Sequence, residues 1–231
     1  MTSHLASTIR SGFYALLALV NAACAQSIPI RYEIFFKDQL VATQNVTLAE
    51  ANGVFSFSSF FEADLPVFVA RHVYSESISA SWRKDGTLLQ FQSVRIDGPN
   101  RFEASGAFSD ETGILEVFRT DSYGTTISQW SRKDYDFHSL AIYGTPPDGF
   151  LPAHNPAKVF DVARGTVVPI DIHAVDQSET TQERQHVASK MLAWTQGPFV
   201  SRSWHPERHS NLPTRYLRHT ENGQFTFVLQ R

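Results

Sequence analysis

Apolar and polar residues alternate along most of the chain, and short turn sequences interrupt the alternation at intervals of about 8 to 12 residues. From Ile30 to Phe36 every second residue is apolar, which is the pattern of a strand with one buried face. Asn52-Gly53 and Asp85-Gly86 favour the tight turns of β-hairpins, because these residues tolerate positive φ. Strands joined in this way predict an antiparallel meander.

About 13 strands are expected, and one flat open sheet does not comfortably hold so many. We therefore predict an all-β fold, with a single curved antiparallel sheet that forms a half-barrel or barrel; a sandwich is the alternative. The doublet Phe60-Phe61 shifts the phase of the alternation and predicts a β-bulge.

The alternation breaks after Tyr135. Asp136 is a candidate N-cap for one short helix that would end at Gly144. Prolines recur through residues 145–156, which we expect to form an irregular crossover. A mobile lid is the other interpretation of this segment.

The first 25 residues have the layout of a secretory signal peptide. An apolar run from Phe13 to Val20 precedes small residues at Ala23 and Ala25. Cleavage after Ala25 would leave residues 26–231 as a single antiparallel β domain, periplasmic or secreted. The apolar run is shorter than the roughly 20 residues that cross a bilayer, and no later stretch approaches that length.

The only cysteine, Cys24, allows a second interpretation, in which it carries a lipid anchor. We favour ordinary cleavage, because Asn21 stands where lipoprotein signals usually have Leu. After such cleavage no cysteine would remain for a disulfide, a thiolate metal site or a nucleophile.

Charge and motifs exclude several functions. The chain has 20 Lys and Arg against 23 Asp and Glu, which argues against nucleic acid as a partner. It has no G-x-S-x-G sequence and no glycine-rich nucleotide loop, so we predict no cofactor and assign no catalytic residue. His205 and His209 are four residues apart, but Pro206 places them in an expected solvated loop, and we predict no metal site.

The 18 phenylalanines are the most unusual feature of the composition. In a half-barrel, some of them would form an apolar pocket for a ligand. The candidate ligand-binding residues are Phe55, Phe57, Phe91, Phe102 and Phe108. The alternative is that these rings fill the core of a curled sheet. Polar residues that face the same pocket, such as His72 or His173, would instead favour an enzyme.

Several short motifs resemble those of a known family. They include the turn from Trp82 to Leu88 and two segments near the C-terminus, Ser203–Pro206 and Leu212–Tyr216. In these the chain resembles exported bacterial proteins grouped as a domain-of-unknown-function family, whose fold is similar to the lipoprotein-carrier half-barrel. The resemblance implies a curved sheet with an apolar concave face, related in shape to periplasmic carriers of acyl chains.

Three functional hypotheses follow. The first is an exported periplasmic or envelope protein that binds a lipid or acyl chain in the concave face of the sheet. The second is an envelope scaffold that acts through protein contacts. The third is an enzyme that acts on a hydrophobic substrate. The sequence leaves the ligand, any reaction and the oligomeric state open.

Overall fold

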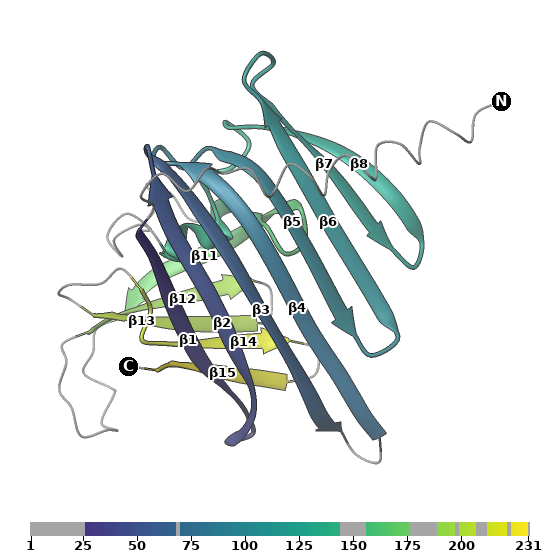
Figure 1. Ribbon diagram of the computed structural model, residues 1–231, viewed down its shortest axis with the longest axis vertical. Coiled ribbons are helices and arrows are strands. Elements are labelled where there is room, and N and C mark those ends of the chain that lie inside the picture. Colours follow the sequence, from purple (N-terminus) through teal and green to yellow (C-terminus); the bar gives the residue numbers. More distant parts are fainter. Residues whose placement is uncertain are drawn as a thin grey trace.

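A computed structural model describes residues 26–67, 70–143, 156–175, 189–196, 199–206, 212–220 and 223–230. In this part of the chain, fifteen strands form one sheet in the order β8-β7-β6-β5-β4-β3-β2-β1-β15-β14-β13-β12-β11-β10-β9 (Figure 1). The strands are Gln26–Phe36 (β1), Gln39–Ala51 (β2), Val54–Val67 (β3), Ala70–Arg83 (β4), Leu88–Asp97 (β5), Asn100–Ser109 (β6), Ile114–Asp121 (β7), Gly124–Ser131 (β8), Phe137–His138 (β9), Ala157–Asp161 (β10), Thr166–Val175 (β11), Ser189–Gln196 (β12), Phe199–Pro206 (β13), Arg215–Thr220 (β14) and Gly223–Leu229 (β15).

The first and last strands meet in the middle of the sheet. Tyr32 of β1 is paired with Leu229 of β15, and β2 lies on the other side of β1. Strands β1–β8 form one wall, and β11–β15 cross behind it at a steep angle in Figure 1. The sheet therefore curls over itself, which confirms the prediction of a single curved sheet, antiparallel except where β9 pairs with β10.

Short hairpins connect the strands of the wall, as the turn sequences predict. Lys37 and Asp38 have φ of 49° and 61°, and Asn52 and Gly53 have φ of 53° and 75°. Two consecutive residues with positive φ are typical of the type I′ turn, whose twist matches that of the flanking strands. Beyond the Asn52-Gly53 turn, β2 and β3 pair without a register shift.

The predicted bulge at Phe60-Phe61 is wrong. Strand β3 pairs with β4 without a register shift, and Phe60 simply faces outward while Phe61 faces the core. Ser59 is buried although it is polar, so the apolar–polar alternation is interrupted in the sequence while the backbone stays regular. Register shifts occur elsewhere, between Ile34 and Phe35 and between Ser81 and Trp82.

The predicted short helix is also replaced by other structure. Phe137 and His138 form strand β9, parallel to β10, and a single 3-10 turn follows at Ser139–Tyr143 (η1). The Asp136 carboxylate accepts a hydrogen bond from the backbone N–H of Lys158, 2.7 Å away, and so fixes a strand rather than capping a helix. Gly144 and residues 145–155 of the predicted crossover lie outside the described residues.

The described residues from β9 to β15, including η1, fold back over the wall, and we call them the returning segment. The core lies between the wall and this segment. Ring contacts join the two sides, such as Phe91 with Phe160 at 5.4 Å between centroids. At Gly165, in the β10–β11 turn, a Cβ atom would lie 2.9 Å from the Ala104 side chain, so the turn packs closely against β6. The described residues contain no helix long and apolar enough to span a bilayer.

Candidate concave-face site

The five candidate phenylalanines share one face of the wall. Directly opposed residues of antiparallel strands point to the same face. Phe57 is opposite Ala80, and Ala80 is opposite Phe91. Phe55 lies two residues before Phe57 on β3. The other two, Phe102 and Phe108 on β6, flank Gly106, the partner of Phe91. We call this the concave face, since it turns toward the returning strands.

The structure divides these rings into two groups. Phe57 and Phe91 are 3% and 4% exposed, because Tyr143 and Phe160 of the returning segment cover them. The other three are half-buried. Phe55 stacks on Trp82 at 5.6 Å, Phe108 packs against the core, and Phe102 lies beneath the Arg95 guanidinium. Core filling therefore describes Phe57 and Phe91, with Phe55 and Phe108 packed at the margin of the core, and the ligand pocket stays a prediction.

Gly106 explains how Phe91 fits against the sheet. A Cβ atom at Gly106 would lie 2.5 Å from Cε1 of Phe91 and 2.9 Å from the carbonyl oxygen of Glu116. Both distances are shorter than any normal carbon contact, so the ring occupies the space that a side chain would need. Glycine at this position therefore leaves room for the Phe91 ring.

A buried ion pair lies on the same concave face. The two guanidinium nitrogens of Arg218, on β14, donate to the two carboxylate oxygens of Glu76 at 2.8 and 2.9 Å. Glu76 is 3% exposed, whereas the Arg218 side chain is 30% exposed. The bidentate geometry satisfies the carboxylate and ties the last hairpin to the middle of the wall.

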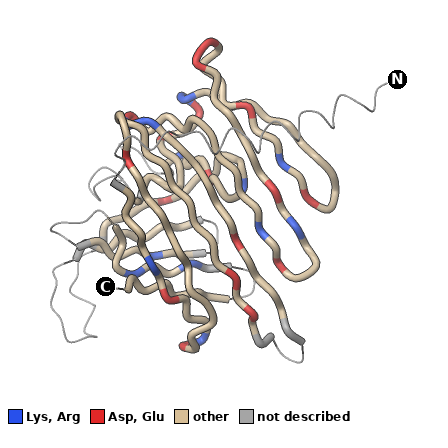
Figure 2. The backbone as a smooth tube through the Cα atoms, in the orientation of Figure 1, with Lys and Arg blue, Asp and Glu red and all other residues tan. Residues whose placement is uncertain are grey.

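Arg95 is a second cation beside this pair. It is opposite Glu76 in the β4–β5 register, and its guanidinium carbon lies 4.5 Å from the Phe102 ring centroid. Its Nε atom is buried and has no hydrogen-bond partner. Arg95 therefore keeps an unused Nε–H donor beside the Phe102 ring. Figure 2 shows that elsewhere on the described strands Lys and Arg are interspersed with Asp and Glu.

Four tyrosines surround the polar part of the interior. The Tyr216 hydroxyl donates to the Gln44 side chain at 2.7 Å, and the Tyr32 hydroxyl donates to the Pro213 carbonyl at 2.9 Å. Burial raises the pKa of Tyr143 to about 12 and raises the pKa of Tyr74. These hydroxyls are therefore neutral donors at physiological pH rather than charged groups.

The two histidines considered for an enzyme have different positions. His72 lies on the concave side of β4, where Nε2 is 2.5 Å from Oδ1 of Asp97, and both side chains are 25% exposed. His173 is exposed on β11, next to the buried Ile172. Only the first is a polar group of the concave face.

His205 differs from its prediction as part of a solvated loop. It belongs to strand β13, is fully buried, and its Nε2 lies 2.9 Å from the Ser203 hydroxyl. That hydroxyl also accepts a hydrogen bond from the Trp194 indole at 3.0 Å. His209 lies outside the described residues, and across the described ranges no three His, Cys, Asp or Glu side chains gather as metal ligands would.

Glu76, Arg95 and Arg218 were not predicted from the sequence. Every second residue of a strand points to the same face. This rule could have placed Glu76 with Tyr74 and Ile78, and Arg95 with Phe91, on the inward face. The alternation could not predict the contact between Arg218 and Glu76, because these residues are 142 apart in sequence and their contact depends on how the sheet curls.

The chain is thus a β-barrel-like domain built from one curled antiparallel sheet. Comparison with known protein families and with curated proteins finds no match. Among solved structures, the chain is similar to a beta-barrel-like protein of domain of unknown function DUF1849 from Brucella abortus. The TM-score is 0.51 at 11% identity, over 88% of this chain and 96% of that one, which shows a shared fold.

Proposed function

We propose that the protein is exported to the cell envelope and binds an anionic lipid on the concave face of its sheet, with the acyl chain on the aromatic wall and the headgroup at Arg95. The observation that carries this proposal is the buried Nε of Arg95, which has no hydrogen-bond partner and lies beside the Phe102 ring. A buried donor without a partner costs about 1–3 kcal/mol, and an anionic headgroup would remove that cost.

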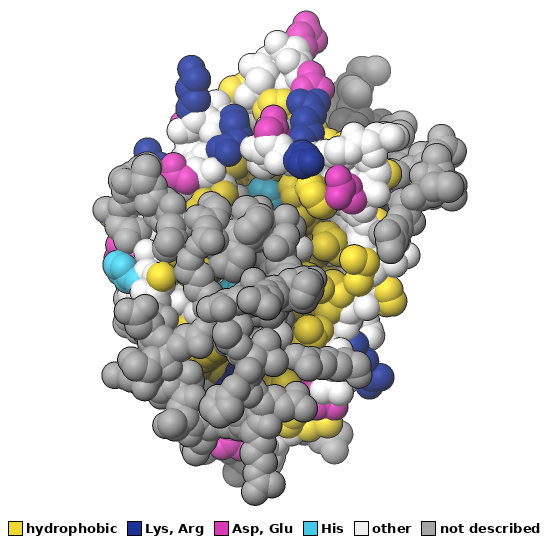
Figure 3. All heavy atoms as spheres, turned by 90° about the vertical axis from the view of Figure 1, so that its left-hand side faces the viewer, with side chains coloured by type: hydrophobic (Ala, Val, Ile, Leu, Met, Phe, Trp, Pro, Cys, Tyr) yellow, Lys and Arg dark blue, Asp and Glu magenta, His cyan; other side chains and the backbone are white. Residues whose placement is uncertain are grey.

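The half-buried phenylalanines supply the apolar part of the proposed site. Phe55, Phe102 and Phe108 are accessible enough to contact an acyl chain. Phe57 and Phe91 act beneath them as support, because Tyr143 and Phe160 already cover their rings. Figure 3 shows hydrophobic side chains gathered in a band at the molecular surface, beside the residues drawn in grey.

The charge arrangement favours an anion over a neutral ligand. The charge of Glu76 is balanced by Arg218, which donates to both of its oxygens, so Arg95 is left as the cation for the headgroup. A guanidinium can form two parallel hydrogen bonds to a carboxylate or to a phosphate. Burial beside an aromatic ring weakens the competition from water for those bonds.

Titration with three ligands tests the proposal. Dodecanoate carries a carboxylate, lysophosphatidic acid carries a phosphate, and dodecanol carries neither. We expect both anions to bind at least tenfold more tightly than dodecanol, because one charge-assisted hydrogen bond contributes about 1.5–3 kcal/mol. A preference between the two anions identifies the headgroup. Equal affinity for all three ligands, or no binding, would contradict the proposal.

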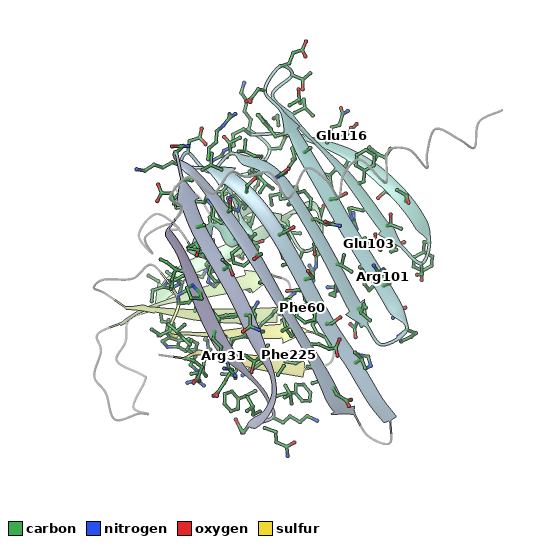
Figure 4. The ribbon with its side chains drawn as sticks, in the orientation of Figure 1. Arg31, Phe60, Arg101, Glu103, Glu116 and Phe225 are labelled. Carbon is green, nitrogen blue, oxygen red and sulfur yellow. The ribbon has the colours of Figure 1, made fainter. Side chains whose placement is uncertain are left out.

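A matched pair of variants locates the site. Arg95→Met should reduce the affinity for the preferred anion at least tenfold and leave dodecanol binding unchanged. Arg101→Met is the control, because Arg101 lies on the outer face of the same hairpin and pairs with Glu103 at 2.6 Å (Figure 4). An equal loss in both variants would show a general charge effect rather than a site.

An enzyme acting on a hydrophobic ester is the second candidate, favoured by the hydrogen bond between His72 and Asp97 on the concave face. A carboxylate that orients an imidazole lets the other ring nitrogen accept a proton from an attacking water. Turnover of 4-nitrophenyl dodecanoate that disappears in His72→Gln, with dodecanoate binding retained, would support it. Binding of dodecanoate without turnover of the ester would contradict the enzyme and support the lipid-binding function.

A further inference from the structure

Strand β8 forms one end of the sheet and has a hydrogen-bonded neighbour, β7, on one side only in the described structure. Its sequence, Gly124 to Ser131, contains no charged residue and no proline, and its register with β7 runs from Gly124 to Ser131 without a bulge. Proteins usually protect an edge strand with charge, proline or a bulge. The opposite end of the sheet is the two-residue strand β9. Of the two ends of the described sheet, β8 is therefore the one that offers a long, unprotected edge.

The hydrogen bonds near Ser131 show which backbone groups face this edge. The N–H of Ser131 donates to the Asp134 carboxylate at 2.5 Å, and its C=O accepts from the Asp134 N–H at 3.0 Å, which is the pattern of a residue whose backbone groups turn away from β7. Antiparallel strands alternate between residues that bond to a given neighbour and residues that do not. Thr125, Ile127 and Gln129 therefore direct their backbone groups away from β7, toward the free edge. The available segment runs from Gly124 to Trp130 and is centred on Ile127.

We infer that β8 pairs antiparallel with β8 of a second copy, about a twofold axis at Ile127. In this register Ile127 is opposite the partner's Ile127, and Thr125 is opposite the partner's Gln129. Each such pair exchanges two backbone hydrogen bonds. The two sheets would join into one continuous sheet with their outer faces on the same side, which is the geometry of an isologous dimer.

The uncharged sequence of β8 favours a second copy as the occupant. No charged residue lies between Gly124 and Ser131, so antiparallel self-pairing about Ile127 places no like charges opposite each other.

Exposed apolar side chains beside the edge support the same pairing. Ile127 is 62% exposed and Phe118, its partner on β7, is 42% exposed on the outer face. In the dimer these residues and their two symmetry mates form one cluster across the axis. The interface is small, so we expect a weak dimer whose population depends on protein concentration.

Sedimentation equilibrium of the protein expressed from the full-length chain tests the inference, over a roughly hundred-fold range of concentration. We expect a monomer–dimer equilibrium. Ile127→Lys should abolish the dimer, because it places two like charges face to face. The control is Ser58→Lys, an exposed position of the same outer face on the central strand β3. A monomer at every concentration, or a dimer unaffected by Ile127→Lys, would overturn the inference.

Disulfide cross-linking tests the register without relying on a charge. With Cys24 replaced by Ser, Ile127→Cys introduces a single thiol, which should form an intermolecular disulfide under diamide oxidation. Opposed residues of a hydrogen-bonded antiparallel pair have Cα atoms about 5.5 Å apart, which suits a disulfide. Thr125→Cys is the control, because the two copies of residue 125 would lie about 13 Å apart. Equal cross-linking of both variants would contradict the register.

Discussion

The two ends of the concave face differ in how they are closed. Near η1 and β9, Phe57, Trp82 and Phe91 are covered by rings of the returning segment, and all three are less than 5% exposed. Near Glu76 and Arg95, the covering strand supplies a charged side chain instead. The same alternating pattern thus produces a sealed aromatic core at one end and a partly open polar surface at the other. Both ends belong to the same wall, so the residues that fold back on each end determine whether it is sealed or partly open.

Truncation at the sealed end should have the largest effect on stability. Phe160 is fully buried and contacts the rings of Phe91 and Tyr135. We expect Phe160→Ala to lower the free energy of unfolding by about 3–5 kcal/mol, because it removes apolar burial and leaves a cavity. Urea denaturation followed by tryptophan fluorescence measures the change.

Phe60→Ala is the matched control, since Phe60 is 52% exposed on the outer face (Figure 4). It should change the free energy of unfolding by less than about 1 kcal/mol. Similar losses in the two variants would mean that the returning segment does not seal this end of the wall.

The polar end should respond more to a lost charge than to lost volume. Glu76→Gln leaves Arg218 without its carboxylate partner in a largely desolvated position. We expect a loss of about 2–3 kcal/mol in the free energy of unfolding, below the value for a fully buried pair because Arg218 retains 30% side-chain exposure. The measurement is the same urea titration.

The double variant Glu76→Leu with Arg218→Met tests whether the loss in Glu76→Gln comes from an unpaired buried charge. Replacing both charges with apolar groups should recover most of the loss, as it does for many buried ion pairs. If Glu76→Gln alone is as stable as the unmodified protein, the ion pair does not hold the last hairpin to the wall.

Local patterns predicted the wall well. Alternation and the Asn52-Gly53 turn place Phe57 and Phe91 on one face, and strands joined by hairpins need only neighbouring sequence to set their register. The error at Phe60-Phe61 came from treating Ser59 as a solvent-facing residue. A small residue with a hydroxyl group fits a buried position beside large rings. Its polarity therefore led to the wrong prediction of which residues of β3 face the core.

The returning segment was harder to predict, because its contacts are distant in sequence. Asp136 was expected to cap a helix, but its carboxylate bonds to the N–H of Lys158, 22 residues further on. His205 was expected in a loop, yet strand β13 buries it against Ser203. Likewise the separation of the phenylalanines into shielded and half-buried rings depends on Tyr143 and Phe160, whose placement only the curled sheet determines.

His138 gives the sealed end a pH dependence. Both ring nitrogens are buried without a hydrogen-bond partner, and the ring packs against Trp82 at 4.9 Å. Burial, with a smaller contribution from Arg132, lowers the pKa of His138 from 6.5 to about 3. In the unfolded chain the imidazole binds a proton below about pH 6.5, whereas in the folded protein it stays neutral until about pH 3.

Stability should therefore fall as the pH drops from 6.5 toward 3, by about 2 kcal/mol between pH 8 and pH 5. His138→Leu should remove this part of the pH dependence, because leucine has no proton to gain in the unfolded state. His173→Leu, at an exposed position, should leave it in place. Urea midpoints measured at both pH values test the comparison. If the midpoint difference between pH 8 and pH 5 is the same in all three proteins, His138 is not the group that makes the aromatic end sensitive to acid.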